Sequence, residues 1–178
     1  MRSILGWILL SGGLVVAAIG FCDAGAAWWD QYRVQPFGAE GESLVLPSGF
    51  TAKLSIPRLD AALYVVDVKR ARDLRRGPGY ITGSAKPGQQ GNCIIAGHRD
   101  LHFRILKDIR VGDEIDIQTQ QGRFKYRVSS ADVVNATNRD SLRGVYPQQL
   151  TLVTCFPFYY IGTAPQRFVV RAYRLQPS

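Results

Sequence analysis

The stretch that decides the fold is Thr151-Leu152-Val153-Thr154-Cys155, with Arg167 following twelve residues later. β-Branched residues and leucine over positions 151–154 predict a buried strand that ends at Cys155. Positions 166–175 predict a second strand that begins near Arg167. A thiol attacks only as the thiolate, and a developing oxyanion needs a fixed positive donor. A hairpin of these two strands would therefore bring a nucleophile and a cation to the same end.

Arg171 competes with Arg167 for the position beside Cys155. The two arginines lie four residues apart on one predicted strand, on the same face but roughly 13 Å from each other. Only one of them can therefore lie at the cysteine, and a short connection favours Arg167.

Short strands dominate the rest of the chain. Eighteen glycines, nine prolines and the scarcity of long helical periods favour an all-β fold. Seven or eight closely spaced strands with two short helices suggest a closed barrel rather than a parallel sheet. Strands are expected at residues 50–56, 62–68, 91–96, 114–117, 123–128 with a continuation at 133–134, 150–155 and 166–175, and helical turns at 70–76 and 102–109.

An apolar segment at residues 4–21 opens the chain, with Arg2 before it and the pair Trp28-Trp29 after it. About 20 apolar residues span a bilayer as a helix, and these flanks predict a cytoplasmic N-terminus. We predict a single-pass membrane anchor at residues 1–29, a linker at 30–48 and the main domain at 49–178, outside the cytoplasmic membrane. The alternative is a signal peptide cleaved near Ala24-Gly25-Ala26.

Charge and cysteine usage narrow the classes of function. The formal net charge of +8 is spread along the chain. Without an aromatic-interleaved basic box or a recognition-helix pattern, we predict no nucleic-acid partner. Three cysteines (Cys22, Cys93 and Cys155) form no disulfide framework. An unpaired cysteine outside the reducing cytosol usually has a chemical role.

His98 follows the apolar run at residues 91–96 and offers a third titratable group. Its spacing from His102 is that of zinc-binding histidines on a helix, but the glutamate of a metalloprotease motif is missing. Zinc held by both histidines and a cysteine is therefore a minor alternative. His98-Arg99-Asp100-Leu101 imitates a kinase catalytic loop, yet Ile105 stands where that loop needs asparagine, which excludes a kinase.

Three separated motifs resemble those of the sortases, the membrane-anchored cysteine transpeptidases. They are Thr151-Leu152-Val153-Thr154-Cys155, Ala96-Gly97-His98 and Arg167-Phe168-Val169-Val170-Arg171, in the order found in that family. The resemblance covers nearly all of residues 49–175. The connection after Cys155 is most similar to class D sortases, and a compact chain without a long lid argues against a pilus-polymerising class C enzyme.

The resemblance implies a closed eight-stranded sortase-type β-barrel with one or two short helices, behind an N-terminal transmembrane helix. Cys155 would attack the threonine carbonyl of a Leu-Pro-x-Thr-Gly-like sorting signal, forming a thioacyl enzyme. Arg167 would donate to the oxyanion or hold the substrate backbone, and His98 would protonate the departing amine. We expect the substrate to be contacted by Thr154, Phe156, Tyr160 and Ala96. Asp100 either tunes His98 or caps the helix that follows it.

The implied partners are a secreted protein with a sorting signal, an amine acceptor such as a cell-wall precursor, and the membrane. No cofactor or metal is expected. Calcium is a minor alternative because some sortases bind it between loop carboxylates. Its candidate ligands here are Asp113, Glu114 and Asp116, which read better as turn and solvent-facing strand residues.

Other functions stay open from the sequence. The same barrel could be a membrane-tethered, non-catalytic peptide-binding module in which Cys155 is structural. It could also be a thiol peptidase that transfers the acyl group only to water. An L,D-transpeptidase would show Ser-His-Gly-Cys around its nucleophile, a motif that this chain lacks.

Overall fold

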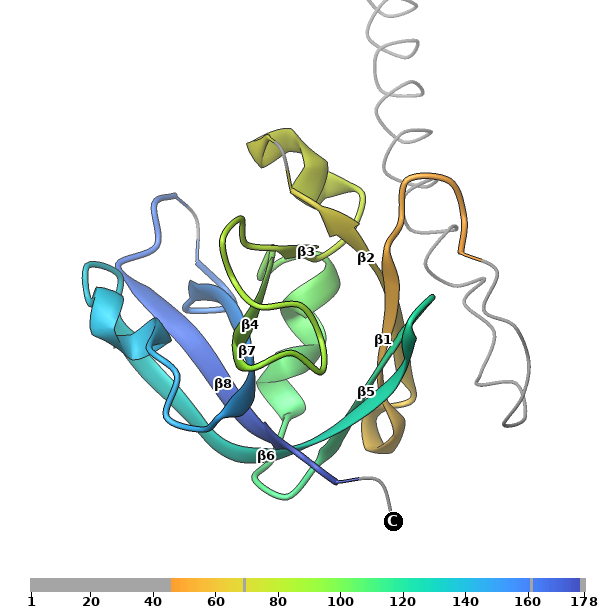
Figure 1. The fold of residues 1–178 in the computed structure, drawn as a ribbon. Helices are drawn as coiled ribbons and strands as arrows, with labels where there is room; N and C mark the ends of the chain where they lie inside the picture. Colours follow the sequence, from red (N-terminus) through yellow and green to blue (C-terminus); the bar gives the residue numbers. More distant parts are fainter. Residues whose placement is uncertain (1–45, 69, 161, 177–178) are drawn as a thin grey trace, which may run out of the picture. The chain divides into compact units, whose positions relative to one another are not determined.

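The computed structural model describes residues 46–176 except 69 and 161. The predicted anchor at residues 1–29 and most of the predicted linker lie outside this range. Within it, no helix has both the length and the apolar character needed to span a membrane. The described residues form a closed eight-stranded β-barrel, as the strand pattern predicted (Figure 1).

The strands follow one another around the barrel in the order β1-β2-β3-β4-β7-β8-β6-β5. Each predicted strand is present, and β3 is an addition whose two residues are too few to show a period. The strands are β1 (Ala52–Ile56), β2 (Ala61–Asp67), β3 (Gly79–Tyr80), β4 (Gly91–Gly97), β5 (Glu114–Thr119), β6 (Gly122–Asn135), β7 (Gln148–Phe156) and β8 (Gln166–Arg174). The described connections contain the 3-10 helices η1 (Pro57–Leu59), η2 (Ala71–Arg75), η3 (His102–Asp108) and η4 (Arg139–Leu142).

Alternation along the strands separates a barrel-filling face from an outward face. Leu150 and Leu152 of β7 and Val170 of β8 are fully buried in the core. Because successive side chains of a strand point to opposite sides, the residues between them face outward. Cys155 lies an odd number of residues from the inward-facing Leu150 and Leu152, so its side chain belongs to the outward face of β7.

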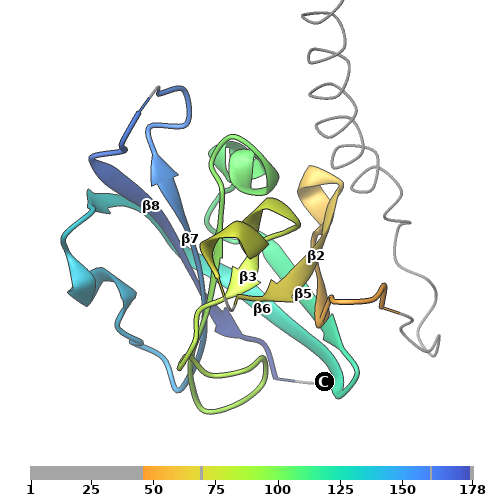
Figure 2. The same ribbon diagram turned by 90° about the horizontal axis from the view of Figure 1, so that it is seen from above.

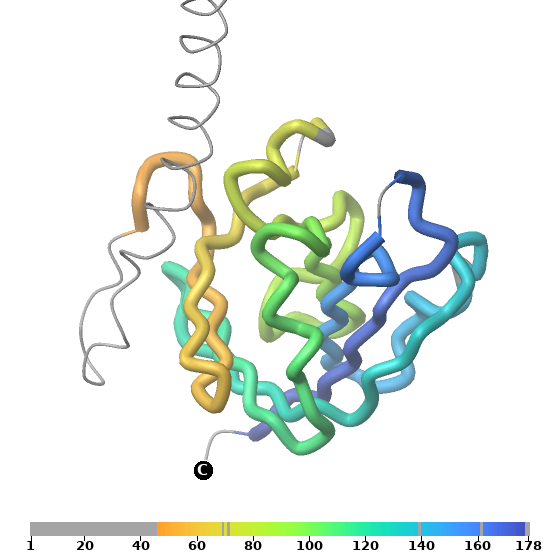
Figure 3. Tube along the Cα trace, turned by 180° about the vertical axis from the view of Figure 1, so that it is seen from behind, coloured from red at the N-terminus to blue at the C-terminus, as the bar shows by residue number. Residues whose placement is uncertain are grey.

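The helix η3 fills the barrel from one side. It lies between β1–β2 and β7 in all three views (Figures 1, 2 and 3). Phe103 and Leu106 are fully buried there. A Cβ atom on Gly97 would lie 2.7 Å from the Phe103 ring, so the helix packs directly on the backbone at the end of β4. Gly97 is therefore needed for close packing just before His98.

We predict that Gly97→Ala lowers the free energy of unfolding by about 1–3 kcal/mol, because the new methyl group overpacks a core that has no room for it. Denaturant unfolding of the full chain measures the loss. Adding Phe103→Leu to the Gly97→Ala variant should restore part of the lost free energy of unfolding, since the smaller side chain leaves space for the new methyl group. Additive losses in the double variant would contradict the proposed contact.

His102 is a buried histidine at the start of η3. Its side chain is buried and its Nδ1 has no hydrogen-bond partner among the described residues. Burial, with a smaller effect of His98, lowers the pKa of His102 to about 4. His102 is therefore neutral in the folded protein at neutral pH.

We predict that the fold loses stability as the pH falls from 6.5 to about 4. Over this window the unfolded chain takes up a proton at His102 that the folded chain does not bind. His102→Phe should reduce this loss. Urea unfolding of both proteins, at neutral pH and at the acid end of the window, measures it. An equal acid-side loss in both would show that folding does not perturb His102.

Candidate active site

The register of three neighbouring strands brings the predicted chemical groups to one end of the barrel. β4 runs parallel to β7 with Gly97 opposite Thr154. His98 follows Gly97 and Cys155 follows Thr154, so these two residues come next at the same end of the paired strands. β8 runs antiparallel to β7 with Arg167 directly opposite Cys155. Directly opposite residues of antiparallel strands have Cα atoms about 4.5–5.5 Å apart.

The competition between the two arginines is decided by the same register. Arg171 lies opposite Thr151, four residues from Cys155 along the sheet. The prediction that only Arg167 lies beside the cysteine is confirmed.

The Thr154 hydroxyl fixes the register of β4 on β7. It is buried and donates a 2.7 Å hydrogen bond to the Gly97 carbonyl oxygen. This placement corrects our expectation that Thr154 lines a groove beside Cys155. As the neighbour of Cys155 on a strand, Thr154 points to the opposite side, into the barrel.

The guanidinium of Arg167 is held at the start of β8 by its own loop. Nη1 donates to the carbonyl oxygens of Ala164 at 3.2 Å and Gln166 at 2.9 Å. Within the described residues, these are the hydrogen bonds of this side chain, and none joins it to His98 or Cys155. Since a guanidinium carries five N–H donors, those on Nε and Nη2 are left for a substrate oxygen.

An aromatic cluster anchors the chain that follows Cys155. The ring of Phe156 lies 5.8 Å from that of Phe158 and 6.4 Å from that of Phe168, measured between centroids. Phe158 and Phe168 pack against the core. Phe156 takes part in this packing but is only half-buried, so our expectation that it contacts the substrate stays a prediction.

Arg99 ties the β7–β8 connection to the end of β4. Its Nη2 donates to the carbonyl oxygens of Tyr160 at 2.7 Å and Gly162 at 3.0 Å, and its guanidinium lies 5.6 Å from the centre of the Tyr160 ring. In the sequence, Arg99 stands out only as part of a kinase-like string, which gives no sign of this role. Tyr160 is exposed, and its expected contact with the substrate stays a prediction.

Side chains of η3 also contact the β7–β8 connection. The Arg104 guanidinium lies 5.2 Å from the centre of the Tyr159 ring. Hydrogen bonds from Arg104 and from Lys107 lower the pKa of Tyr159. Two successive tyrosines are thus engaged by arginines on the β4 side of the site.

The remaining two candidates have different surroundings. Ala96 lies opposite Val153 and is half-buried on the outward face that carries Cys155. Asp100 is exposed and does not cap η3, whose N-cap is Leu101 without a side-chain hydrogen bond. Its alternative role beside His98 stays a prediction.

The three candidate calcium ligands each pair with a different arginine. Asp113 accepts a 2.7 Å hydrogen bond from Arg58, which lowers the pKa of the carboxyl group. The other two ion pairs are Asp116 with Arg123 and Glu114 with Arg127. Over the part of the chain that the structure describes, no group of three or more His, Cys, Asp or Glu side chains has the arrangement of a metal site.

Comparison with known proteins agrees with this arrangement. The family model of the sortase domain matches residues 54–175. The chain belongs to the sortase family. Sortases are cell-wall transpeptidases and are typically anchored in the membrane.

Individual sortases show the same relationship. Sortase D of Bacillus subtilis (strain 168) is 31% identical over 123 residues, which make up 68% of this chain and 62% of that protein. The chain thus spans less than two thirds of this relative. The structure of a Clostridium perfringens Sortase D5 transpeptidase has 26% identity and a TM-score of 0.64, covering 71% of this chain and 79% of the other. Sortase A from Corynebacterium diphtheriae has 33% identity and a TM-score of 0.65, covering 72% and 62%.

We predict that Arg99→Met lowers the activity that depends on Cys155 by about 10-fold, corresponding to about 1.4 kcal/mol. The variant loses both hydrogen bonds to the β7–β8 connection, so Tyr160 and the backbone near Arg167 are no longer held. Arg75→Met, which removes an exposed arginine of η2, is the matched control. Equal activity of the two variants would contradict this role of Arg99.

Proposed function

We propose that this sortase is a cysteine transpeptidase that cleaves a Leu-Pro-x-Thr-Gly-like sorting signal and transfers the acyl part to an amine. Cys155 is the nucleophile, Arg167 the donor to the oxyanion, and His98 the general acid and base. The observation that carries the proposal is the register that sets Arg167 opposite Cys155 and Gly97, the residue before His98, opposite Thr154.

In the first half-reaction, the Cys155 thiolate attacks the threonine carbonyl carbon and a C–S bond forms. Arg167 donates hydrogen bonds to the oxyanion, whose charge is stabilised by a fixed cation. The C–N bond to glycine then breaks as the His98 imidazolium gives its proton to the leaving amine. The products are a thioester on Cys155 and a released peptide with a free amino group.

In the second half-reaction, an incoming amine attacks the thioester carbonyl. Neutral His98 takes the proton from that amine, and the C–S bond breaks to return the Cys155 thiolate. The new amide replaces the peptide bond that was cleaved. Atoms and charge balance without a cofactor, and we propose that none is required.

The cellular setting of the proposal follows from the N-terminal segment. Residues 1–29 would hold the enzyme in the membrane as a single-pass anchor, with the barrel on the outer side. The donor substrate would be a secreted protein with a sorting signal, and the acceptor an amine such as that of a cell-wall precursor.

We predict that the full chain cleaves a fluorescence-quenched Leu-Pro-x-Thr-Gly peptide and that Cys155→Ala abolishes cleavage. Mass spectrometry of the acid-quenched reaction should detect the acyl group on Cys155 as a thioester. An added amine should yield the transpeptidation product in place of the hydrolysed acid.

Arg167→Met should lower kcat/KM by about 100-fold or more, as the loss of one oxyanion donor does in other acyl-transfer enzymes. Arg75→Met is the control here too. Binding of the peptide without any cleavage would replace the proposal with a peptide-binding module. Cleavage with an unchanged product mixture on addition of amine would indicate a hydrolytic peptidase.

A further inference from the structure

The outward face of β4, β7 and β8 carries different chemistry at its two ends. Cys155 and Arg167 lie at one end. Four residues away, before Cys155 on β7 and after Arg167 on β8, Thr151 lies opposite Arg171. Between them lie Val153 and Val169, also paired across the two strands. An apolar floor thus separates the reactive end from a polar end.

The segment between β6 and β7, residues 136–147, connects the two ends of this face. Its first residue donates a backbone hydrogen bond of 3.1 Å from Ala136 to Pro165, next to the start of β8 and therefore near Arg167. Its last residues enter β7 at Gln148, at the far end. Val169 is fully buried although it faces outward, so the floor is covered there.

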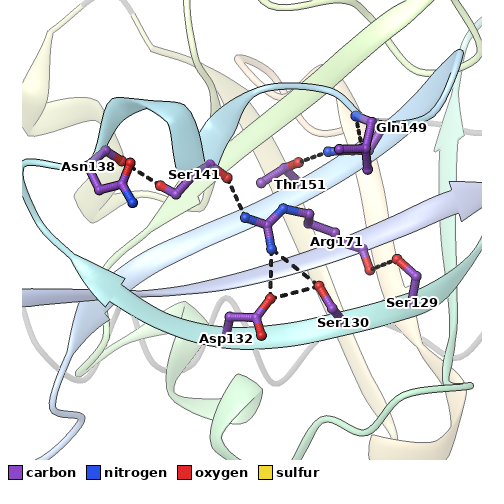
Figure 4. Close-up of polar contacts among 9 residues, drawn as sticks. Ser129, Ser130, Asp132, Asn138, Ser141, Gln149, Thr151 and Arg171 are labelled. Carbon is purple, nitrogen blue, oxygen red and sulfur yellow. Dashed lines mark hydrogen bonds and ion pairs between the residues drawn. The ribbon is translucent and has the colours of Figure 1, made fainter.

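Arg171 binds this segment to the barrel, as Figure 4 shows. Nη2 donates to the Ser141 carbonyl oxygen at 2.7 Å, which holds η4. Nη1 donates to Asp132 Oδ2 at 2.7 Å and to Ser130 Oγ at 3.3 Å, both on β6. The arginine side chain is only 18% exposed. One guanidinium from β8 therefore joins β6 and η4.

A second set of buried polar side chains holds the later part of the segment. Gln149 is 1% exposed, and its Oε1 accepts a 2.8 Å hydrogen bond from the backbone N–H of Val145. Its Nε2 donates to Thr151 Oγ1 at 2.8 Å. Thr151 in turn donates to Asn92 Oδ1, and Asn92 Nδ2 donates to the Leu142 carbonyl oxygen at 2.7 Å.

We propose that Arg171 is a positioning residue that keeps residues 136–147 folded as one wall of the site before any substrate binds. The wall would confine an extended peptide over Val153, the half-buried part of the floor that leads to Cys155. This inference deepens the proposed function and rests on it. The hydrogen bond from Arg171 to Ser141 orders the wall, so substrate affinity depends on a residue roughly 13 Å from Arg167, the partner of the nucleophile.

Arginine is required because two acceptors must be bridged at once. The planar guanidinium presents donors in fixed directions, whereas an ammonium group is a single point. Arg171→Lys keeps the positive charge near Asp132, but one nitrogen does not reproduce the bridge to Ser141. Without the bridge, the Ser141 carbonyl loses its partner and η4 is released from β8.

The test combines hydrogen exchange with kinetics on the full chain. In Arg171→Lys and Arg171→Met, amides of residues 136–147 should exchange at least 10-fold faster than in the parent, while β7 and β8 keep their protection. KM for the quenched peptide should rise about 10-fold with kcat within a factor of two. Arg127→Met, which removes an ion pair with Glu114 on the β5–β6 side, should change neither quantity.

Exchange at the parent rate in Arg171→Lys overturns the inference, whether or not the protein cleaves the peptide. Faster exchange with an unchanged KM also overturns it, because the wall would then not contact substrate. If Arg171→Met does not fold, the lysine variant carries the same test. If the parent protein shows no Cys155-dependent cleavage, the proposed function fails while the exchange result still decides whether Arg171 orders the segment.

Discussion

The pairing of β7 with β4 on one side and with β8 on the other is the constraint on which the site depends. A one-residue slip would turn the outward face of a strand inward. Cys155 would then point into the barrel, and His98, which follows the last residue of β4, would no longer be level with it. The register is secured from inside by Leu150 and Leu152 in the core, and at its last residue pair by the hydrogen bond from Thr154 to Gly97.

The connections between strands are held by arginines that bind backbone carbonyl oxygens. Arg99 binds the β7–β8 connection and Arg171 binds the segment before β7. Each guanidinium has enough donors to engage two or more acceptors at once. The barrel therefore supplies a rigid floor, and these two side chains hold the loops that rise from it on either side.

Strand patterning predicted much of this arrangement because alternation is a local property of the sequence. It located β7 and β8 and placed Cys155 at a strand end, while the short connection between the two strands favoured Arg167 over Arg171. The same alternation should have excluded Thr154 as a groove residue, since the residue before Cys155 on the strand must face the other way. Val153, two residues away, shares the face of the cysteine.

Long-range hydrogen bonds from side chains to backbone carbonyl oxygens leave no such pattern in the sequence. A carbonyl oxygen exists at every residue, so nothing in the sequence marks Tyr160 or Ser141 as the acceptor of a particular arginine. The roles of Arg99 and Arg171 therefore emerged only from the fold. The two-residue strand β3 was missed for a related reason, because its pairing with β2 and β4 is set by tertiary packing.

Cross-linking is the most direct measurement of the central register. In a chain whose other two cysteines are replaced by serine, Arg167→Cys should form a disulfide with Cys155 on mild oxidation. Directly opposite strand residues have Cα atoms within the range of about 4.4–6.8 Å that a disulfide needs. Arg171→Cys, in the same background, should stay unlinked. Cross-linking from position 171, or from neither position, would contradict the alignment of β7 with β8 and with it the proposed site.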